Sequence, residues 1–153
     1  MVFDSALDII GNTPLVRLEK IAKKYNLEGN IYAKVEYYSP GLSKKDRIAK
    51  YIIVKAIKEG KLKKGQVVIE QTSGNTGIGL AMVCAVLGYP FVAVMSEGNS
   101  VERVKMIEAF GGKVELVKKV DSHKGVSSKD MQEVEKRFKQ LVKELDAFPV
   151  GQF

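Results

Sequence analysis

The second half of the chain alternates between short apolar runs and longer stretches of helical length. The apolar runs are rich in β-branched residues and have the length of strands: VVIE at 67–70, FVAVM at 91–95 and KVELV at 113–117. The helical stretches lie at 76–87, 100–110 and 128–145. Because continuous apolar strands that alternate with helices are typical of βαβ units, the pattern predicts an α/β fold with a parallel sheet covered by helices on both faces.

Residues that start and stop helices lie at the ends of these stretches. Ser100 stands where a helix N-cap is expected, and Gly88 and the pair Gly111 and Gly112 stand where helices should end. Two shorter strand candidates, at 15–18 and 31–36, precede this block. We find no internal repeat and no low-complexity linker, so the pattern alone marks no domain boundary.

The composition fits one ordinary domain. The chain has 153 residues, and 45% of them are hydrophobic, which is enough to bury a core. Its net charge is +7, but the basic residues are spread along the chain and mixed with acids, which favours a solvated surface over nucleic-acid binding. The uncharged run at 78–95 approaches the length of a membrane span, but Gly88 and Pro90 divide it into a buried helix and a strand. We therefore expect neither a nucleic-acid partner nor a membrane partner.

Cysteine and histidine each occur once. Cys84 lies in the apolar run AMVCAVLG, where a thiol behaves as a small buried hydrophobe, and His123 lies in a polar stretch, where we expect an ordinary loop residue. One residue of each kind cannot form an intramolecular disulfide or a clustered metal site. Because the N-terminal residues also lack the pattern of a secretory signal, we expect a reducing, cytoplasmic location.

The stretch SPGLSKKDRIA, residues 39–49, places two lysines at the start of a predicted helix. Ser43 and Asp46 have the spacing of a capping box, which puts Lys44 and Lys45 in the first turn. Consecutive helix residues point about 100° apart, so the two amines cannot face the same pocket. Lys45 shares the apolar face of the helix with four residues, and Lys44 does not. These four residues are Ile48, Ala49, Ile52 and Ala56.

An inward lysine in the first turn has two interpretations. Burial, the positive end of the helix dipole and a neighbouring cation all favour the neutral amine, which is the form that attacks an aldehyde to make a Schiff base. Alternatively, the Lys45 side chain reaches solvent or pairs with an acid, as most partly buried lysines do. This stretch alone favours the second interpretation.

The turn EQTSGNTGIGLA, residues 70–81, lies between a predicted strand and a predicted helix. In open α/β sheets, ligands bind at the carboxyl ends of the strands, where the following helix presents free N–H groups. Gly74 and Gly77 let a ligand approach the backbone, and Thr72, Ser73, Asn75 and Thr76 add donors suited to a carboxylate. The glycine spacing does not fit a nucleotide loop. The alternative is a polar turn that caps the helix, with Thr72 or Ser73 as the N-cap.

Several stretches together resemble one family. GNTPLVRL, SPGLSKKDRIA and EQTSGNTGIGLA, followed by MSEGNSVERVKMIEAFGGKVELV and GQF, are similar in order and spacing to fold-type II pyridoxal-phosphate enzymes of the cysteine synthase and cystathionine β-synthase group. The resemblance covers nearly the whole chain and implies a tryptophan synthase β-like fold with pyridoxal 5′-phosphate as cofactor.

The resemblance also implies roles for individual residues. Lys45 matches the lysine that forms the Schiff base, and Asn75 matches the residue that hydrogen-bonds the 3′ oxygen of the cofactor. The substrate carboxylate would be held by a loop and by one distant glutamine. These residues are Thr72, Ser73, Gly74 and Thr76, together with Gln152.

The reaction implied is β-replacement on an O-activated serine. A small amino acid such as O-acetylserine would exchange its leaving group for sulfide to give cysteine, so the expected partners are this amino acid and sulfide or a thiol. The chain departs from the family pattern at Ser39, Leu42, Lys44 and Gln71, and in the stretch MSEGNS. Because several of these positions surround the expected pocket, a sulfide-releasing cysteine lyase or a thioether-forming synthase stays open.

The resemblance finally implies that the chain is an N-terminal half. Members of this family are about twice as long, which suits two domains. Their glycine-rich phosphate cradle lies beyond residue 153, and residues 13–37 would belong largely to the sheet of the second domain. We therefore expect residues 1–153 alone to be inactive and the complete protein to be a homodimer. The alternative to an enzyme is a truncated, catalytically silent fragment.

Overall fold

The computed structural model describes residues 2–120, 122 and 125–151. Within these residues, four parallel strands form one sheet in the order β5-β4-β3-β6. The strands are β3 (Val68–Gln71), β4 (Phe91–Ser96), β5 (Lys113–Val117) and β6 (Phe148–Pro149). The first three confirm the strands predicted from the apolar runs. The short β6 was not predicted, since two residues carry no readable periodicity.

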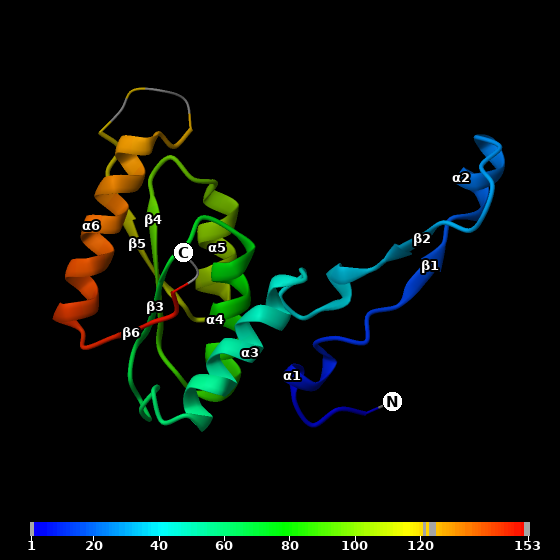
Figure 1. The fold of residues 1–153 in the computed structure, drawn as a ribbon. Coiled ribbons are helices and arrows are strands. Elements are labelled where there is room, and N and C mark those ends of the chain that lie inside the picture. The colour runs from blue at the N-terminus through cyan, green and yellow to red at the C-terminus, as the bar shows by residue number, and fades with distance from the viewer. Residues whose placement is uncertain (1, 121, 123–124, 152–153) are drawn as a thin grey trace.

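Helices cover both faces of this sheet, as predicted (Figure 1). The helices are α3 (Lys45–Lys58), α4 (Asn75–Leu87), α5 (Val101–Ala109) and α6 (Ser128–Glu144). Successive strand residues point to opposite faces. Accordingly, Val68 packs with α3 and α4, whereas its neighbour Ile69 packs with Val134 and Leu141 of α6. The helix ends also agree with the predicted caps, because Gly88 ends α4 with a φ of 75° and Ser100 precedes α5.

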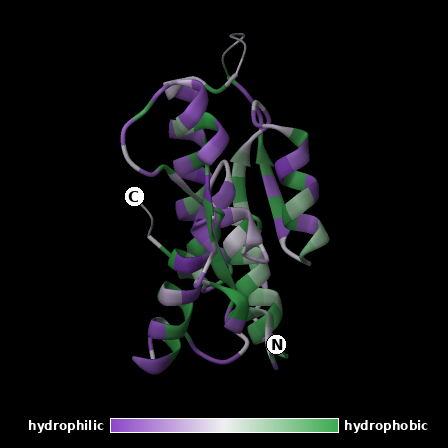
Figure 2. Cartoon of the chain, turned by 90° about the vertical axis from the view of Figure 1, so that its right-hand side faces the viewer, coloured by the Kyte–Doolittle hydropathy of each residue, from purple (hydrophilic) through white to green (hydrophobic). Residues whose placement is uncertain are grey.

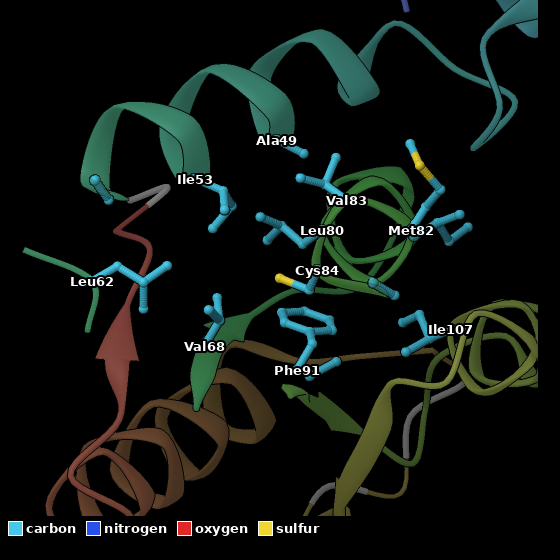
Figure 3. Close-up of a cluster of buried hydrophobic side chains, with 14 of the residues drawn as sticks. Ala49, Ile53, Leu62, Val68, Leu80, Met82, Val83, Cys84, Phe91 and Ile107 are labelled. Carbon is cyan, nitrogen blue, oxygen red and sulfur yellow. The ribbon is translucent and has the colours of Figure 1, made fainter. Parts of the chain in front are cut away.

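The main core forms around α4. Leu80, Val83 and Cys84 are buried, and Ala49 and Ile53 of α3 face them (Figure 3). Apolar residues gather on the strands and on α4, while the outer helices carry hydrophilic ones (Figure 2). Burial raises the pKa of the Cys84 thiol to about 12, so this residue is the buried hydrophobe that its sequence context predicts. Among the described residues, every helix is too short or too polar to span a bilayer.

The first part of the chain extends away from this body as an arm, defined here as residues 11–38 (Figure 1). The arm contains β1 (Leu15–Arg17), α2 (Glu19–Lys24), β2 (Tyr32–Lys34) and the short helix η1 (Glu36–Tyr38), and it follows α1 (Ala6–Ile9). β1 and β2 pair only with each other, in antiparallel order. None of the residues of β1, α2 or β2 is buried.

Polar contacts fix the base of the arm to α3. The Arg47 guanidinium donates to the Thr13 hydroxyl at 3.0 Å and to the Glu36 carboxylate at 3.2 Å. The hydrogen bond from Arg47 holds the pKa of the Glu36 carboxyl below its usual range. Leu7 of α1 is buried against the main core. The arm is therefore anchored at its start and end, while its β1–β2 pair projects outward.

Candidate functional site

The turn after β3 lies at the edge of the sheet where parallel strands end. β3 ends at Gln71 and β4 at Ser96, and the two strands are neighbours. Helix α4 then starts at Asn75 with Gly74 as its N-cap. The alternative prediction, in which Thr72 or Ser73 is the N-cap residue, is therefore wrong, although the Thr72 hydroxyl accepts one N–H of the first helical turn, that of Gly77.

Free donors converge at this helix start. No described residue accepts a hydrogen bond from the backbone N–H of Ser73, Gly74, Asn75 or Thr76. Free N–H groups and the helix dipole together favour a negative charge at this point. The Ser73 and Asn75 residues are exposed, whereas Thr76 is buried. The turn thus has the donor set that suits a carboxylate.

Thr72 fixes the inner side of the turn. Its side chain is buried, and its hydroxyl oxygen accepts a hydrogen bond from the Gly77 N–H at 3.1 Å. A Cβ on Gly77 would lie 2.6 Å from the Thr72 methyl group, so only glycine lets the threonine pack there. Because the hydroxyl oxygen accepts this bond, its proton stays available to a ligand.

Lys45 and Lys44 differ in exposure at the start of α3. Lys44 is exposed, as predicted, and Lys45 is half-buried. Ala49 and Ala56 are buried on the predicted face of α3, but Ile48 is 42% exposed and Ile53 is fully buried. The buried face is thus centred about one residue away from the predicted one, which places Lys45 at its edge.

A glycine lets the start of α3 lie close to α4. A Cβ on Gly79 would lie 3.3 Å from the Lys45 carbonyl carbon and 3.3 Å from the Asp46 nitrogen. Gly79 lies about one helical turn after Asn75. The start of α3 therefore packs against the first turns of α4, and Lys45 and Asn75 belong to the same end of this helix pair.

Asp46 does not form the predicted capping box. Its carboxylate accepts a hydrogen bond from the Gly41 N–H at 2.6 Å, while the Ser43 hydroxyl accepts one from the Lys45 N–H at 3.2 Å. Asp46 is fully buried, and no described residue bonds its second oxygen or the buried hydroxyl of Ser39. Loss of hydration raises the pKa of the Asp46 carboxyl. A buried acid therefore braces the turn that carries Lys45.

Arg103 of α5 is a residue that the sequence reasoning missed. Its Nη1 donates a hydrogen bond to the Ser73 carbonyl oxygen at 2.6 Å. The parallel sheet contained a signal for this contact, because α5 starts at the carboxyl end of β4, beside the turn that follows β3.

The hollow that the turn lines at this site is small. The hollow between Thr72, Ser73, Ser96 and Asn99 has a volume of about 20 Å³, which is room for about one water molecule. A larger hollow of about 560 Å³ runs along the outer face of α3, past Tyr51 and Val54, and the turn does not line it. Gln152 and His123 lie outside the described residues.

Comparisons with known proteins show the family to which the chain is similar. Residues 6–153 match the family described as pyridoxal-phosphate dependent enzymes. The chain is 50% identical over 115 residues to an O-ureido-L-serine synthase of Streptomyces lavendulae, covering 75% of this chain and 35% of the relative. It is 44% identical over 126 residues to a cysteine synthase of Staphylococcus aureus, covering 82% of this chain and 40% of the relative.

A solved structure extends the similarity to the fold. The crystal structure of a hydrogen sulfide-producing enzyme from Fusobacterium nucleatum matches with a TM-score of 0.85 and 38% identity, covering 99% of this chain and 46% of that chain. The chain therefore spans less than half the length of each of these relatives.

Proposed function

Because the chain belongs to the family of pyridoxal-phosphate-dependent enzymes, we propose that its protein catalyses β-replacement on an O-activated serine. The most specific form of the proposal is a cysteine synthase, which joins O-acetylserine and sulfide into cysteine and acetate. One observation carries the proposal. Four free backbone N–H groups at the start of α4 lie at the same end of the α3–α4 pair as Lys45.

The residues of this chain fit part of a pyridoxal-phosphate site. Lys45 offers a half-buried amine and Asn75 an exposed amide, and the orphaned polar atoms of Ser39 and Asp46 lie in the same segment as Lys45. When bound, the cofactor stabilises negative charge at the α-carbon of the amino acid. Lys45 would hold the cofactor through its amine, and Asn75 would donate a hydrogen bond to the 3′ oxygen of the cofactor.

The chain's own residues would then bind the substrate and move its proton. The carboxylate of the amino acid would accept hydrogen bonds at the turn 72–76, with Gln152 as a further donor. The amine of the amino acid would replace the Lys45 amine on the cofactor. The freed Lys45 amine would then take the α-proton, acetate would leave the β-carbon with the C–O electron pair, and sulfide would bond to that carbon. Lys45 would return the proton to the α-carbon.

The arm supports the proposal of a second domain. Its β1–β2 pair leaves large apolar side chains exposed, among them Leu15 at 63% and Tyr32 at 52%. Exposed apolar surface of this kind marks a site of contact. We propose that residues 13–37 complete the sheet of a second domain, as the resemblance implies, and that the complete protein is a homodimer.

The decisive experiment uses the protein expressed from its complete reading frame and reconstituted with pyridoxal phosphate. A lysine-bound cofactor absorbs visible light, and this absorbance should disappear in Lys45→Ala. The matched control is Lys44→Ala, which removes the neighbouring exposed amine and should keep the absorbance. If the absorbance survives in Lys45→Ala, Lys45 does not hold the cofactor.

A second candidate differs in substrate and in reaction, because it releases sulfide instead of adding it. The hydrogen sulfide-producing neighbour suggests a lyase that releases sulfide from cysteine. Supplying O-acetylserine with sulfide, and cysteine alone, separates the two activities. Formation of cysteine supports the synthase, and release of sulfide supports the lyase. If neither product forms and no absorbance develops, the silent-fragment alternative holds.

A further inference from the structure

Arg103 clamps the outer side of the turn 72–76. Its Nη1 lies 2.6 Å from the Ser73 carbonyl oxygen, and a Cβ on Gly74 would lie 3.7 Å from Nη1 and 3.8 Å from Cζ. The guanidinium therefore lies over the Ser73–Gly74 peptide, while Thr72 and Gly77 fix the inner side of the turn. The two contacts hold the turn from opposite ends.

The charge of Arg103 lacks a counter-ion among the described residues. No described acid lies within ion-pair distance of its guanidinium, and the neighbouring Glu102 accepts a hydrogen bond from the Ser100 hydroxyl instead. A cation beside the start of α4 is disfavoured by the positive end of the helix dipole. An anion bound at the turn would attract both the Arg103 guanidinium and the helix start, which offsets this unfavourable interaction, so the placement of Arg103 suits a ligand-bound site.

The hydrogen bond from Arg103 also orients a donor. The Ser73 carbonyl and the Gly74 N–H belong to one planar peptide unit, in which the two groups point in opposite directions. Because Arg103 fixes the carbonyl toward α5, the Gly74 N–H points away from α5. No described residue accepts a hydrogen bond from this N–H.

We propose that Arg103 is a positioning residue for the carboxylate-binding turn. It holds the Ser73 carbonyl away from the anion, presents the Gly74 N–H to it, and adds positive potential that raises the affinity for an α-carboxylate. This inference rests on the proposed function, because it assigns the turn to the carboxylate of an amino-acid substrate.

The test compares binding of L-serine and of L-serinamide, which lacks the carboxylate charge. Binding is measured by calorimetry on the cofactor-loaded protein from the complete reading frame. Arg103→Met should weaken L-serine binding by about tenfold and leave L-serinamide binding nearly unchanged. Arg103→Lys keeps the charge but loses the planar donor, so it should recover part of the affinity. Lys105→Met is the matched control, since Lys105 is exposed on the same helix.

The outcomes distinguish a failure of the Arg103 role from a failure of the proposed function. If Arg103→Met weakens both ligands equally, or only lowers the melting temperature, the positioning role is wrong although the proposed function stands. The same holds if Arg103→Met behaves as Lys105→Met does. If the unmodified protein binds neither ligand and shows no Lys45-dependent absorbance, both the inference and the proposed function fail.

Discussion

At the scale of single residues, Asp46 shows how a buried acid stabilises a turn at some cost. One carboxylate oxygen accepts the Gly41 N–H, and the other has no partner among the described residues. A buried polar group without a partner costs about 1 to 3 kcal/mol. The hydrogen bond holds the segment that precedes Lys45, so this cost falls beside the amine that we propose holds the cofactor.

The raised pKa of Asp46 predicts a pH dependence of stability. The folded protein holds the Asp46 proton more tightly than the unfolded chain does. The stabilisation from this group is therefore present below the unfolded pKa, near 3.8, and is lost as the pH rises toward the higher folded pKa. Asp46→Asn should gain stability relative to the natural protein between pH 4 and pH 7, measured by denaturant unfolding.

The exposed Asp8→Asn serves as the control for this prediction. Asp8 is exposed, so this variant removes a carboxylate without changing a buried site. If the gain of Asp46→Asn over the natural protein does not grow between pH 4 and pH 7, or if Asp8→Asn shows the same gain, burial of the Asp46 carboxyl does not cause the effect.

At the scale of elements, the same sequence spacing gives two different helix starts. Ser127 and Asp130 form a capping box before α6, with hydrogen bonds of 2.9 Å and 3.2 Å. Ser43 and Asp46 have the same spacing, yet Asp46 bonds to Gly41. The difference is tertiary, because Gly41 and Gly79 leave room for the Asp46 carboxylate against α4. Spacing alone cannot distinguish the two cases.

The packing of α3 against α4 predicts a cost for Gly79→Ala. Alanine favours a helix by about 1 kcal/mol over glycine. Here its Cβ would press on the backbone of Lys45 and Asp46 at 3.3 Å, and backbone cannot move aside as a side chain can. We expect a net loss of about 1 to 3 kcal/mol in the free energy of unfolding. The loss is measured by denaturant titration, together with reduced cofactor absorbance as Lys45 shifts.

Ala85→Gly isolates the backbone contribution to this effect, because Ala85 is exposed on the same helix. It should lower stability by about 1 kcal/mol and leave the cofactor absorbance unchanged. A stabilised Gly79→Ala variant would contradict close packing between the two helices.

At the scale of the whole molecule, the arm and the sheet body should differ in resistance to protease. Residues of β1, α2 and β2 are not buried, whereas the strands of the main sheet carry buried side chains. Limited trypsin digestion of residues 1–153 should therefore cut first in the arm, at Lys20, Lys23 or Lys24, with fragments identified by mass spectrometry.

The complete protein provides the comparison for this prediction. If a second domain covers the arm, the same three lysines should become protected there, while exposed lysines of α6 such as Lys136 should be cut at a similar rate in both. Equal cutting of the arm in both proteins would contradict the proposal that residues 13–37 pack in a second domain.

The sequence by itself determined the first three strands of the parallel sheet, the bounds of α4, α5 and α6 to within about one residue, and the turn with its glycines. These features depend on local periodicity and on β-branched runs. They also depend on residues such as Gly88, which adopts the positive φ that ends α4. Helical phase also determined that Lys44 and Lys45 face different ways, because this phase depends on neighbours in sequence.

Only the tertiary structure decided which residues meet at the site. The hydrogen bond from Arg103 to Ser73 and the approach of Lys45 to Gly79 each join segments that sequence spacing does not relate. Such contacts depend on how helices pack across a sheet, and no local pattern encodes them. The donors of the turn could therefore be predicted from the chain, while the residues that hold the turn in place required the fold.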